Sequence, residues 1–432
     1  MQYISTRDKN LRVTFEQAVK RGLAPNKGLF VPEHYIQLPK EFWDNLYGMS
    51  LQEIGYQVGR QYVGDEIPDA DFRALCEDVL SFDIPLVNVK DNIYSLELFH
   101  GPTCAFKDVG ARFMARCLGY FSRQRNEKTV ILVATSGDTG SAVANGFLNV
   151  PGVDVIILYP SGKVSEIQEK QLTTNGNNIT ALEVNGVFDD CQALVKTAFA
   201  NFDTKDKIKL TSANSINIAR LIPQSFYYYY AVSQLRRDDA IICVPSGNFG
   251  NITGGILALK SGLKVKQFVA ATNANDTVPK YLETGVYTAK PSVQTISNAM
   301  DVGDPSNFER LDMIFGHDCS NFGATIASYS FTDDATRAKM KETYKQHGYI
   351  LDPHGAVGML GIERQLGDDR TTPGVFLETA HPSKFLDVVQ EATGITPPLP
   401  ESLKKCLDKQ KVSIKIDNDY RQLEKILSNR YL

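Results

Sequence analysis

Several of the sequence patterns that identify common protein classes are missing from this chain. Its seven cysteines include no Cys-x-x-Cys pair, so we expect no dithiol redox motif and predict reduced thiols. Its six histidines form no His-x-x-x-His pair and no Cys/His cluster of zinc-ligand spacing, so we predict no metal site. The Gly-x-Gly-x-x-Gly and Walker A patterns are also absent, which removes the main support for a dinucleotide or nucleoside triphosphate site.

The sequence has no strong excess of charge and no long apolar run. It holds 46 Lys and Arg against 50 Asp and Glu, a formal net charge of −4, which provides no broad positive field for a nucleic acid. Residues 1–8 lack the apolar core of a signal peptide. No apolar run approaches the roughly 20 residues that span a bilayer. We therefore expect a cytoplasmic protein with no nucleic-acid and no membrane partner.

The length and the apolar pattern favour a multi-domain protein. With 432 residues, 43% of them hydrophobic, the chain can bury more than one core. Residues 1–80 are polar and mixed, with amphipathic stretches at 15–21 and 51–63. We predict a small N-terminal domain there.

From residue 93 onward, short runs rich in Val and Ile alternate with longer amphipathic segments. The apolar runs lie at 129–134, 154–159, 179–184, 208–211, 240–244, 267–271 and 375–377. The helical candidates lie at 110–122, 141–148, 164–172, 191–199, 223–235 and 251–261. Continuous apolar runs of this length suit strands that are buried on both faces of a parallel sheet. The alternation predicts an α/β fold with open, mostly parallel sheets flanked by helices, and ligands at the carboxyl ends of the strands.

One loop has the composition of a phosphate-binding turn. Residues 245–251 read Pro-Ser-Gly-Asn-Phe-Gly-Asn and lie between a predicted strand and a predicted helix. Glycines let successive backbone N–H groups converge on one anion, and the positive end of the following helix adds to the attraction. Such a loop can hold a phosphate without any lysine. The alternative is a plain strand-to-helix turn.

A second loop between a strand and a helix, residues 135–141, reads Thr-Ser-Gly-Asp-Thr-Gly-Ser. Its hydroxyl and amide groups suit a small anion such as an amino-acid carboxylate. Ser and Asp are also ordinary helix caps, so both interpretations stay open on the residues alone.

Lys107 is the candidate nucleophile. It follows Ala105 and Phe106 in a turn of small residues that leads into a predicted helix. Partial burial of the amine beside these apolar neighbours favours its neutral, nucleophilic form. A lone lysine is usually a surface charge, but two anion-binding loops follow this one on the same predicted sheet.

Four motifs together resemble those of the threonine synthases among the fold type II pyridoxal-phosphate enzymes. They are Pro-Thr-Cys-Ala-Phe-Lys-Asp-Val-Gly at 102–110, Ser-Gly-Asp-Thr-Gly at 136–140, Pro-Ser-Gly-Asn-Phe-Gly-Asn at 245–251 and Glu-Thr-Ala-His-Pro at 378–382. Segments 3–7, 301–310 and 351–356 are similar to the microbial and fungal branch of that family, so the resemblance covers nearly the whole chain. It implies the fold type II architecture, with residues 81–432 as a pyridoxal-phosphate-binding catalytic region made of two α/β subdomains.

The resemblance also implies roles for individual residues around a pyridoxal 5'-phosphate cofactor. Lys107 would carry the cofactor as a Schiff base, and Thr379 would meet the pyridine nitrogen. Asp138 stands where relatives have an asparagine that faces the 3-hydroxyl of the cofactor; the aspartate is typical of this branch, and its contact is left open. The cradle for the cofactor phosphate would be formed by Gly247, Asn248, Phe249, Gly250 and Asn251.

Two further groups of residues are implied for the substrate, O-phospho-L-homoserine. The first group belongs to the second loop and suits the substrate carboxylate: Ser136, Gly137 and Thr139. The second group resembles residues that hold the substrate phosphate: Asn214, Ser215, Arg220 and, as a second candidate for the same anion, Lys163.

The implied reaction converts O-phospho-L-homoserine and water to L-threonine and phosphate by β,γ-elimination and replacement, with Lys107 as the shuttle for several protons. Another fold type II lyase, such as threonine dehydratase, is one alternative, and a catalytically silent ligand-binding relative is the other. The residues for the substrate phosphate speak against the first. Retention of Lys107 with both loops speaks against the second. A monomer and a homodimer are equally compatible with the sequence.

Overall fold

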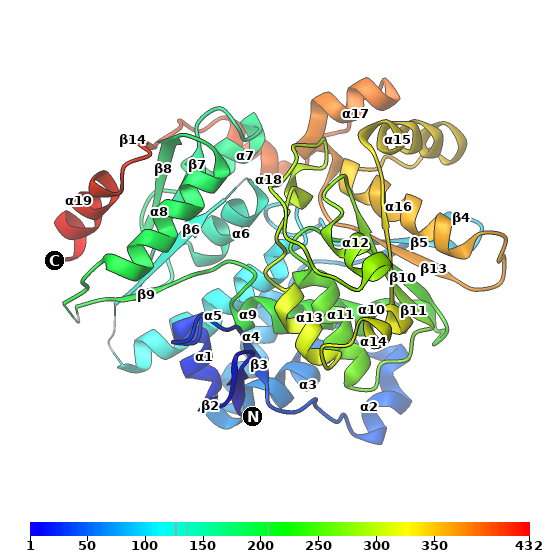
Figure 1. Ribbon diagram of the computed structural model, residues 1–432, viewed down its shortest axis with the longest axis horizontal. Coiled ribbons are helices and arrows are strands. Elements are labelled where there is room, and N and C mark those ends of the chain that lie inside the picture. The colour runs from blue at the N-terminus through cyan, green and yellow to red at the C-terminus, as the bar shows by residue number, and fades with distance from the viewer. Residues whose placement is uncertain (126–127, 136, 206) are drawn as a thin grey trace.

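The computed structural model shows two α/β lobes and a smaller N-terminal layer that lies along one side of both (Figure 1). The structure describes residues 1–125, 128–135, 137–205 and 207–432. One lobe is built on a five-stranded sheet and carries the C-terminus, and the other is built on a six-stranded sheet.

The N-terminal layer combines a three-stranded antiparallel sheet with four helices. β1 (Tyr3–Ser5) lies between β2 (Asp8–Val13) and β3 (Phe30–Pro32). The helices are α1 (Phe15–Arg21), α2 (Lys40–Asn45), α3 (Leu51–Val63) and α4 (Asp69–Val79). α1 begins where Thr14 and Gln17 form a capping box, because their side chains satisfy amides that the first helical turn leaves free. The amphipathic intervals 15–21 and 51–63 are confirmed as α1 and α3.

The six-stranded sheet has the strand order β12-β11-β10-β13-β5-β4. Its strands are β4 (Leu86–Lys90), β5 (Ile93–Glu97), β10 (Ile241–Pro245), β11 (Gln267–Thr272), β12 (Ile326–Ser330) and β13 (Gly374–Glu378). All neighbours are parallel except β4 and β5. Every residue of β10 and β13 is buried, so these central strands appear in the sequence as continuous apolar runs.

The five-stranded sheet is parallel throughout, in the order β14-β8-β7-β6-β9. Its strands are β6 (Thr129–Ala134), β7 (Val153–Pro160), β8 (Ile179–Asn185), β9 (Lys209–Thr211) and β14 (Ile414–Asp417). β6 and β7 are buried at every position. The C-terminal strand β14 extends this sheet by pairing with β8.

Helices flank both sheets. Those of the lobe with the five-stranded sheet are α5 (Lys107–Arg125), α6 (Asp138–Phe147), α7 (Glu166–Thr173), α8 (Phe188–Asn201) and α19 (Tyr420–Tyr431). Those of the other lobe are α10 (Phe226–Leu235), α11 (Gly250–Lys260), α12 (Thr277–Thr284), α13 (Phe308–Ile314), α14 (Cys319–Thr325), α15 (Asp333–His347), α16 (Pro353–Leu366) and α17 (Leu386–Thr393). α9 (Ile218–Leu221) contacts α5, and α18 (Glu401–Leu407) contacts α7.

The predicted α/β architecture is confirmed. All seven apolar runs form strands, and all six helical candidates form helices, with ends that differ by a few residues. The interval 223–235 is divided between a 3₁₀ helix, η3 (Ile222–Ser225), and α10.

In the described ranges no helix is long and apolar enough to cross a membrane. No group of three or more His, Cys, Asp or Glu side chains in those ranges is placed to hold a metal ion.

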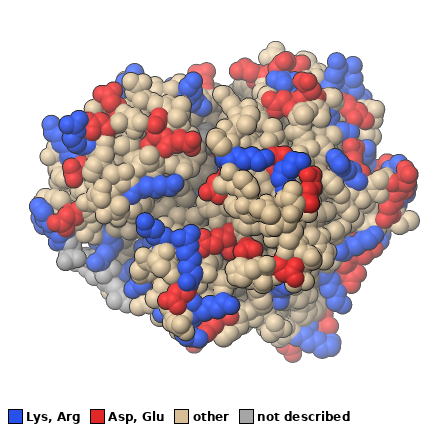
Figure 2. Space-filling view, viewed as in Figure 1, with Lys and Arg blue, Asp and Glu red and all other residues tan. Residues whose placement is uncertain are grey.

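Acidic and basic side chains are mixed over the surface. Figure 2 shows Lys and Arg interspersed with Asp and Glu on the visible face, without a continuous basic surface. This distribution agrees with the near-balanced formal charge of −4.

Candidate active site

The carboxyl ends of three neighbouring strands bring the main candidate residues together. In the six-stranded sheet, β13 lies between β10 and β5. The chain leaves β10 through the 245–251 loop, leaves β13 at Thr379, and leaves β5 through the turn that ends at Lys107. Because these strands are parallel, all three exits lie on one edge of the sheet, where open α/β sheets bind ligands.

Backbone hydrogen bonds hold the Lys107 turn against the end of β13. The Phe106 amide donates to the Thr379 carbonyl at 2.9 Å, and the His381 amide donates to the Cys104 carbonyl at 3.0 Å. Lys107 is the first residue of α5, so its backbone is fixed by the turn before it and the helix after it. The turn therefore holds Lys107 beside Thr379.

The surroundings of Lys107 favour a neutral amine. Burial lowers the pKa of Lys107 to about 8; the carboxylate of Asp138 opposes this shift, and the cations of Arg220 and Lys384 add to it. Lys107 Nζ also lies 5.6 Å from the centroid of the Phe106 ring. A lysine with this pKa is neutral in a sizeable fraction of molecules near neutral pH, as a nucleophile or a general base must be.

The 245–251 loop presents a row of free amides. Across the described residues, no hydrogen-bond acceptor meets the backbone N–H groups of Gly247, Asn248, Phe249, Gly250 and Asn251. Phe249 adopts a left-handed conformation with φ of 59°, and α11 begins directly after it. Successive free N–H groups at the start of a helix attract an anion such as a phosphate.

Both asparagine side chains of this loop form hydrogen bonds that fix the path of the backbone. Asn248 Nδ2 donates to Ser215 Oγ at 2.5 Å, and Asn248 Oδ1 accepts from the Ser306 amide at 2.5 Å. Asn251 Nδ2 donates to the Pro245 carbonyl at 2.8 Å. The loop therefore offers its amides to an anion, while its asparagine side chains fix its path.

Gly247 is required by the segment that covers the loop. A Cβ at this position would lie 2.6 Å from the Cα of Met300 and 3.0 Å from the carbonyl oxygen of Ala299. Both neighbours are backbone atoms, so a side chain could be accommodated only by moving the chain at 299–300.

Thr379 presents a buried hydroxyl at the same edge. The residue is 6% exposed, and its carbonyl is the acceptor for Phe106. No side-chain hydrogen bond of Thr379 is found within the described part of the chain, so the hydroxyl is available to a ligand.

The 135–141 loop follows β6 of the five-stranded sheet, so the prediction that both anion-binding loops lie on the same sheet as Lys107 is wrong. Within this loop, the Thr135 side chain accepts hydrogen bonds from two backbone amides. Its Oγ1 accepts from the amides of Gly137 at 3.0 Å and Gly140 at 2.8 Å. Gly137 has φ of 141°, a conformation that favours glycine. Thr139 is half-buried at the start of α6. Ser136, also predicted to meet the substrate, lies outside the described residues.

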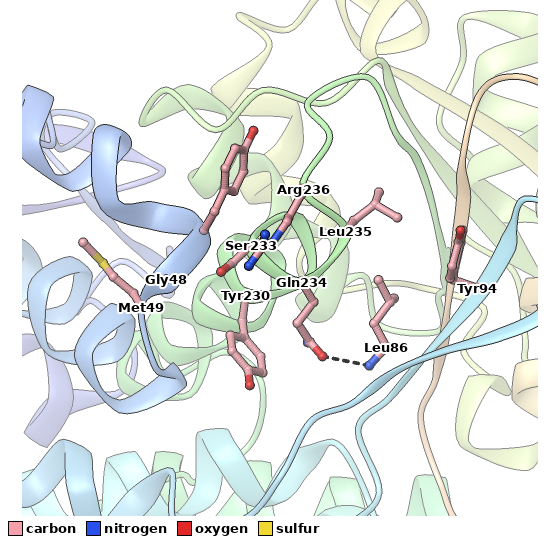
Figure 3. A pocket seen from close by; sticks show the side chains of 10 residues that line it. Gly48, Met49, Leu86, Tyr94, Tyr230, Ser233, Gln234, Leu235 and Arg236 are labelled. Carbon is pink, nitrogen blue, oxygen red and sulfur yellow. Dashed lines mark hydrogen bonds between the residues drawn. The ribbon is translucent and has the colours of Figure 1, made fainter.

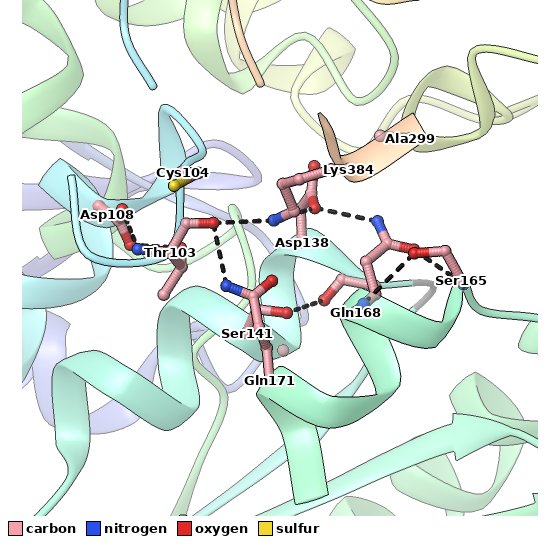
Figure 4. A network of polar contacts seen from close by, with 12 residues as sticks. Thr103, Cys104, Asp108, Asp138, Ser141, Ser165, Gln168, Gln171, Ala299 and Lys384 are labelled. Atoms are coloured by element: carbon pink, nitrogen blue, oxygen red, sulfur yellow. Dashed lines mark hydrogen bonds and ion pairs between the residues drawn. The ribbon is translucent and has the colours of Figure 1, made fainter. Parts of the chain in front are cut away.

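Asp138 forms a buried ion pair that the sequence did not predict. Its Oδ1 lies 2.6 Å from Nζ of Lys384 and accepts from Gln168 Nε2 at 3.0 Å. Figure 4 shows this pair within a longer chain of polar contacts that reaches Thr103. Burial alone would raise the pKa of Asp138, but the ammonium groups of Lys384 and Lys107 bring it well below its usual range. Asp138 is therefore charged at neutral pH.

Arg220 is a buried cation with no carboxylate partner within the described ranges. It lies on α9 and is 3% exposed. Its Nη1 donates to the Ala213 carbonyl, and its Nε has no partner. Burial lowers the pKa of Arg220 to about 10, against a small opposing effect of Asp108. A Cβ on Gly110, one turn after Lys107, would lie 3.1 Å from Arg220 Nε, so the guanidinium packs on the first turn of α5.

The other residues predicted to bind the substrate phosphate differ in their burial and in their hydrogen-bond partners. Ser215 Oγ accepts from Asn248 at 2.5 Å, which links the Arg220 region to the 245–251 loop. Asn214 has a buried Oδ1 without a partner. Lys163 is exposed, in the turn between β7 and α7. Arg220 is thus buried and Ser215 half-buried, whereas Lys163 is exposed.

Three family models match the chain in sequence order. Residues 2–80 match the model described as threonine synthase N terminus, residues 84–377 match pyridoxal-phosphate dependent enzyme, and residues 355–427 match threonine synthase, C-terminal. A threonine synthase of Haemophilus influenzae is 45% identical over 422 residues, which are 96% of this chain and 97% of the relative. The chain belongs to the threonine synthase family.

Further relatives agree with this assignment. The threonine synthase of Escherichia coli is 41% identical and covers 99% of this chain and 100% of its own length. A solved structure of pyridoxal-phosphate-bound threonine synthase from Brucella melitensis superposes with a TM-score of 0.93 at 36% identity, covering 100% of this chain and 99% of that one. The predicted fold type II architecture and pyridoxal phosphate as the cofactor are confirmed. The matches favour threonine synthase over a dehydratase or a silent relative.

The residues of this threonine synthase fit the cofactor chemically. A phosphate needs several donors, and five consecutive amides without acceptors begin at Gly247. The aldehyde group of the cofactor reacts with a neutral amine, and the lowered pKa of Lys107 favours that form. A ring nitrogen needs a nearby polar group, and the Thr379 hydroxyl has no other partner in the described chain.

Two buried cations were missed when only the sequence was considered. Lys384 lies three residues after His381, the histidine of the Glu-Thr-Ala-His-Pro motif, and Arg310 ends the quoted 301–310 segment. Both are at most 1% exposed. Their nearness to family motifs was the one available signal, because a buried lysine or arginine is uncommon unless it has partners.

A separate hollow of about 660 Å³ lies between the N-terminal layer and α10, near Tyr47 and Tyr230 (Figure 3). Two of its polar side chains are paired: Ser233 Oγ donates to the Leu46 carbonyl, and Gln234 binds backbone groups of residues 84 and 86. Its lining contains no lysine, histidine or carboxylate. This hollow therefore lacks groups for the acid–base chemistry of a threonine synthase.

Proposed function

We propose that this member of the threonine synthase family converts O-phospho-L-homoserine and water to L-threonine and inorganic phosphate around Lys107. The observation that carries the proposal is that the chain has two separate groups that can attract an anion. One is the row of amides that begins at Gly247, and the other is the buried guanidinium of Arg220. A cofactor phosphate and a substrate phosphate need one site each, whereas an enzyme acting on an unphosphorylated amino acid needs only the first.

The resemblance to the family implies a role for each residue, and the positions described above support these roles. Lys107 Nζ would hold the cofactor covalently, the 247–251 amides would bind its phosphate, and the Thr379 hydroxyl would serve its ring nitrogen. The loop with Ser136, Gly137 and Thr139 binds the substrate carboxylate. Arg220, supported by Asn214 and Ser215, binds the substrate phosphate, with the exposed Lys163 as a second cation.

Bound pyridoxal phosphate supplies an electron-withdrawing ring that stabilises negative charge at the α-carbon of the substrate. Lys107 supplies the proton transfers. With the cofactor bound, Lys107 Nζ would take the α-proton of the substrate and serve the later proton transfers at the β- and γ-carbons, because a pKa of about 8 lets the amine both accept and donate near neutral pH.

We also propose a cytoplasmic enzyme that acts as a monomer or homodimer, with an N-terminal domain at 1–80 and a two-subdomain catalytic region at 81–432. Its only required partners are the cofactor and the small-molecule substrate. The mixed surface charge (Figure 2) supports the expectation of no nucleic-acid or membrane partner.

The test is a product assay with the purified yellow protein. Phosphate and threonine should appear in equal amounts from O-phospho-L-homoserine, while L-threonine alone should give little keto acid. Rapid keto-acid formation from L-threonine, with no phosphate release from O-phospho-L-homoserine, would establish a dehydratase instead.

A further inference from the structure

A buried ion pair joins the two lobes and contacts the turn that leads to Lys107. Lys384 lies in the 3₁₀ helix η5 (Pro382–Phe385), which follows β13 of the six-stranded sheet. Asp138 is the first residue of α6, which follows β6 of the five-stranded sheet. Lys384 Nζ lies 2.6 Å from Asp138 Oδ1, and the two side chains are 0% and 4% exposed.

Lys384 also contacts the turn that carries Lys107. Its Nζ donates to the Thr103 carbonyl at 2.9 Å. Thr103 is fixed in turn by Asp108, which accepts from the Thr103 amide at 2.8 Å and from its hydroxyl at 2.6 Å. Figure 4 shows these contacts as one continuous network from Asp108 through Thr103 and Lys384 to Asp138. One ammonium group therefore touches both Asp138 and the start of the Lys107 turn.

The contacts of the Asp138 carboxylate with described residues are made through one of its two oxygens. Oδ1 is shared by Lys384 and Gln168 Nε2, whereas Oδ2 meets no partner among the described residues. The start of α6 further favours a negative charge at this position. Asp138 is thus an oriented carboxylate and not a flexible one.

The negative charge of Asp138 favours the protonated form of Lys107 unless a positive charge balances it. The charged groups that face Lys107 are Asp138 from α6, Arg220 from α9 and Lys384 from η5. An unbalanced carboxylate favours the ammonium form of a neighbouring lysine, and an ammonium cannot attack a carbonyl.

We propose that Lys384 is a positioning residue that neutralises and orients Asp138, so that Asp138 can lie beside Lys107 without holding its amine in the charged, unreactive form. The inference rests on the proposed role of Lys107 as the amine that binds the cofactor. It explains how this chain accommodates an aspartate at position 138, because the charge that the aspartate adds is balanced inside the site.

The test measures Lys107 itself, in the full chain freed of cofactor. The protein is treated briefly with acetic anhydride at a series of pH values, and the modified Lys107 peptide is quantified by mass spectrometry. In Lys384→Met the labelling midpoint should rise by about one pH unit, so that labelling at neutral pH falls about tenfold. Lys384→Arg should stay close to the wild type, because it keeps the positive charge.

Two further variants separate electrostatics from packing. Asp138→Asn should move the midpoint in the opposite direction, to lower pH, because the attraction for the ammonium is lost. The neutral pair Asp138→Asn/Lys384→Met should return the midpoint close to the wild-type value. Asp138→Asn remains informative if Lys384→Met does not fold, because the Lys384 ammonium that it leaves without a carboxylate still donates to the Thr103 carbonyl. The double variant leaves neither charge of the pair buried.

A matched control is Lys339→Met. Lys339 is also nearly buried and paired, with Glu342 and Glu363 each at 2.6 Å, but it lies on α15 away from Lys107. It should leave the Lys107 profile unchanged. The proposal is overturned if Lys384→Met leaves the profile where it was, or if Asp138→Asn shifts it in the same direction as Lys384→Met. A failure of the proposed function would look different: pyridoxal phosphate and borohydride would then leave the wild-type Lys107 peptide unmodified.

Discussion

Arg310 Nε donates a hydrogen bond to the carbonyl oxygen of Phe30 at 3.1 Å, and this contact joins α13 to β3 of the N-terminal sheet. The same guanidinium donates to the carbonyl oxygens of Ser215 and Ile216 and to Oδ1 of Asn307. Arg310 is completely buried. The N-terminal sheet is therefore tied, through one side chain, to the loop that carries the proposed ligands of the substrate phosphate.

Arg310→Met should destabilise the protein and weaken substrate binding together. The change removes the donor from two buried and two partly buried acceptors, so we expect the free energy of unfolding to fall by about 3 kcal/mol. KM for O-phospho-L-homoserine should rise, because Ser215 loses its support. Urea unfolding and steady-state kinetics measure the two effects.

Arg7→Ala is the matched control for Arg310. Arg7 binds Glu309 of the same helix at 2.8 Å, but its side chain is 52% exposed. Exposed ion pairs contribute less than about 1 kcal/mol. Equal losses for the two variants would show that burial of Arg310 is not what makes its contacts important.

Lys107→Ala should abolish turnover and the visible absorbance of the bound cofactor while the fold is retained. The substitution removes the amine but keeps the backbone hydrogen bonds that hold its turn. Circular dichroism should therefore match the wild type. Borohydride treatment of the wild type should produce a modified Lys107 peptide; a modified peptide elsewhere in the chain would contradict the assignment.

Arg220→Ala should impair binding of O-phospho-L-homoserine about 30-fold and affect an amino acid without a phosphate little. A charge-assisted hydrogen bond to an anion is worth about 2 kcal/mol, and about 1.4 kcal/mol corresponds to a factor of ten. Cofactor content should stay normal. Arg220→Lys keeps the charge but loses the planar geometry, so it should lie between the alanine variant and the wild type. Similar losses for both ligands would mean that Arg220 supports structure only.

The sequence predicts most of the buried interior strands but misses three of the four edge strands of the two large sheets, β4, β12 and β14, for a physical reason. β10 is buried on both faces, so its apolar run is visible without any knowledge of its neighbours. β12 is half-exposed over most of its length, and in β14 only Ile416 is buried. Such strands are defined by the partner they pair with, which a local pattern cannot reveal.

In the candidate site, too, features formed by neighbouring residues could be predicted, whereas contacts between residues far apart in the sequence could not. The 245–251 loop could be predicted because its glycines and the following helix are contiguous. The partner of Asp138 could not, because Lys384 is distant in the sequence and reaches Asp138 only after both sheets have formed. Motifs therefore supply candidate residues for the site around Lys107, whereas the charge balance between Asp138 and Lys384 required the fold.

Glu378, the last residue of β13, lies beside a second buried carboxyl group. Its Oε1 accepts from the Asp352 amide at 2.7 Å, and its Oε2 has no partner. Asp352 accepts from the amides of His354 and Gly355 at the start of α16 and from His354 Nδ1. Burial, followed by the charge of Asp352, raises the pKa of Glu378 well above its usual value.

Glu378→Gln should become more stabilising, relative to the wild type, as the pH rises. Folded Glu378 keeps a proton that the unfolded chain loses above about pH 4.5, so wild-type stability decreases with pH until the folded group ionises. Glutamine has no such titration. The difference in unfolding free energy should grow by up to about 1.4 kcal/mol per pH unit, measured by urea unfolding between about pH 5 and 7. A difference that stays constant with pH would show that Glu378 is charged in the folded protein.

Thr379→Asp should alter the cofactor spectrum and uncouple phosphate release from threonine formation. A hydroxyl is neutral and does not stabilise a proton on the pyridine nitrogen, whereas a carboxylate raises the pKa of that nitrogen and makes the ring a stronger electron acceptor. Stronger stabilisation of charge at the α-carbon should slow the later proton transfers at the β- and γ-carbons and favour side products. We expect less threonine per phosphate released and more keto acid. The Thr379 carbonyl, which accepts from Phe106 at 2.9 Å, is kept in every variant, so Thr379→Asn controls for size without charge and Thr379→Ser should retain the wild-type spectrum. If Thr379→Asp kept both the wild-type spectrum and equal yields of phosphate and threonine, another residue would be the partner of the ring nitrogen.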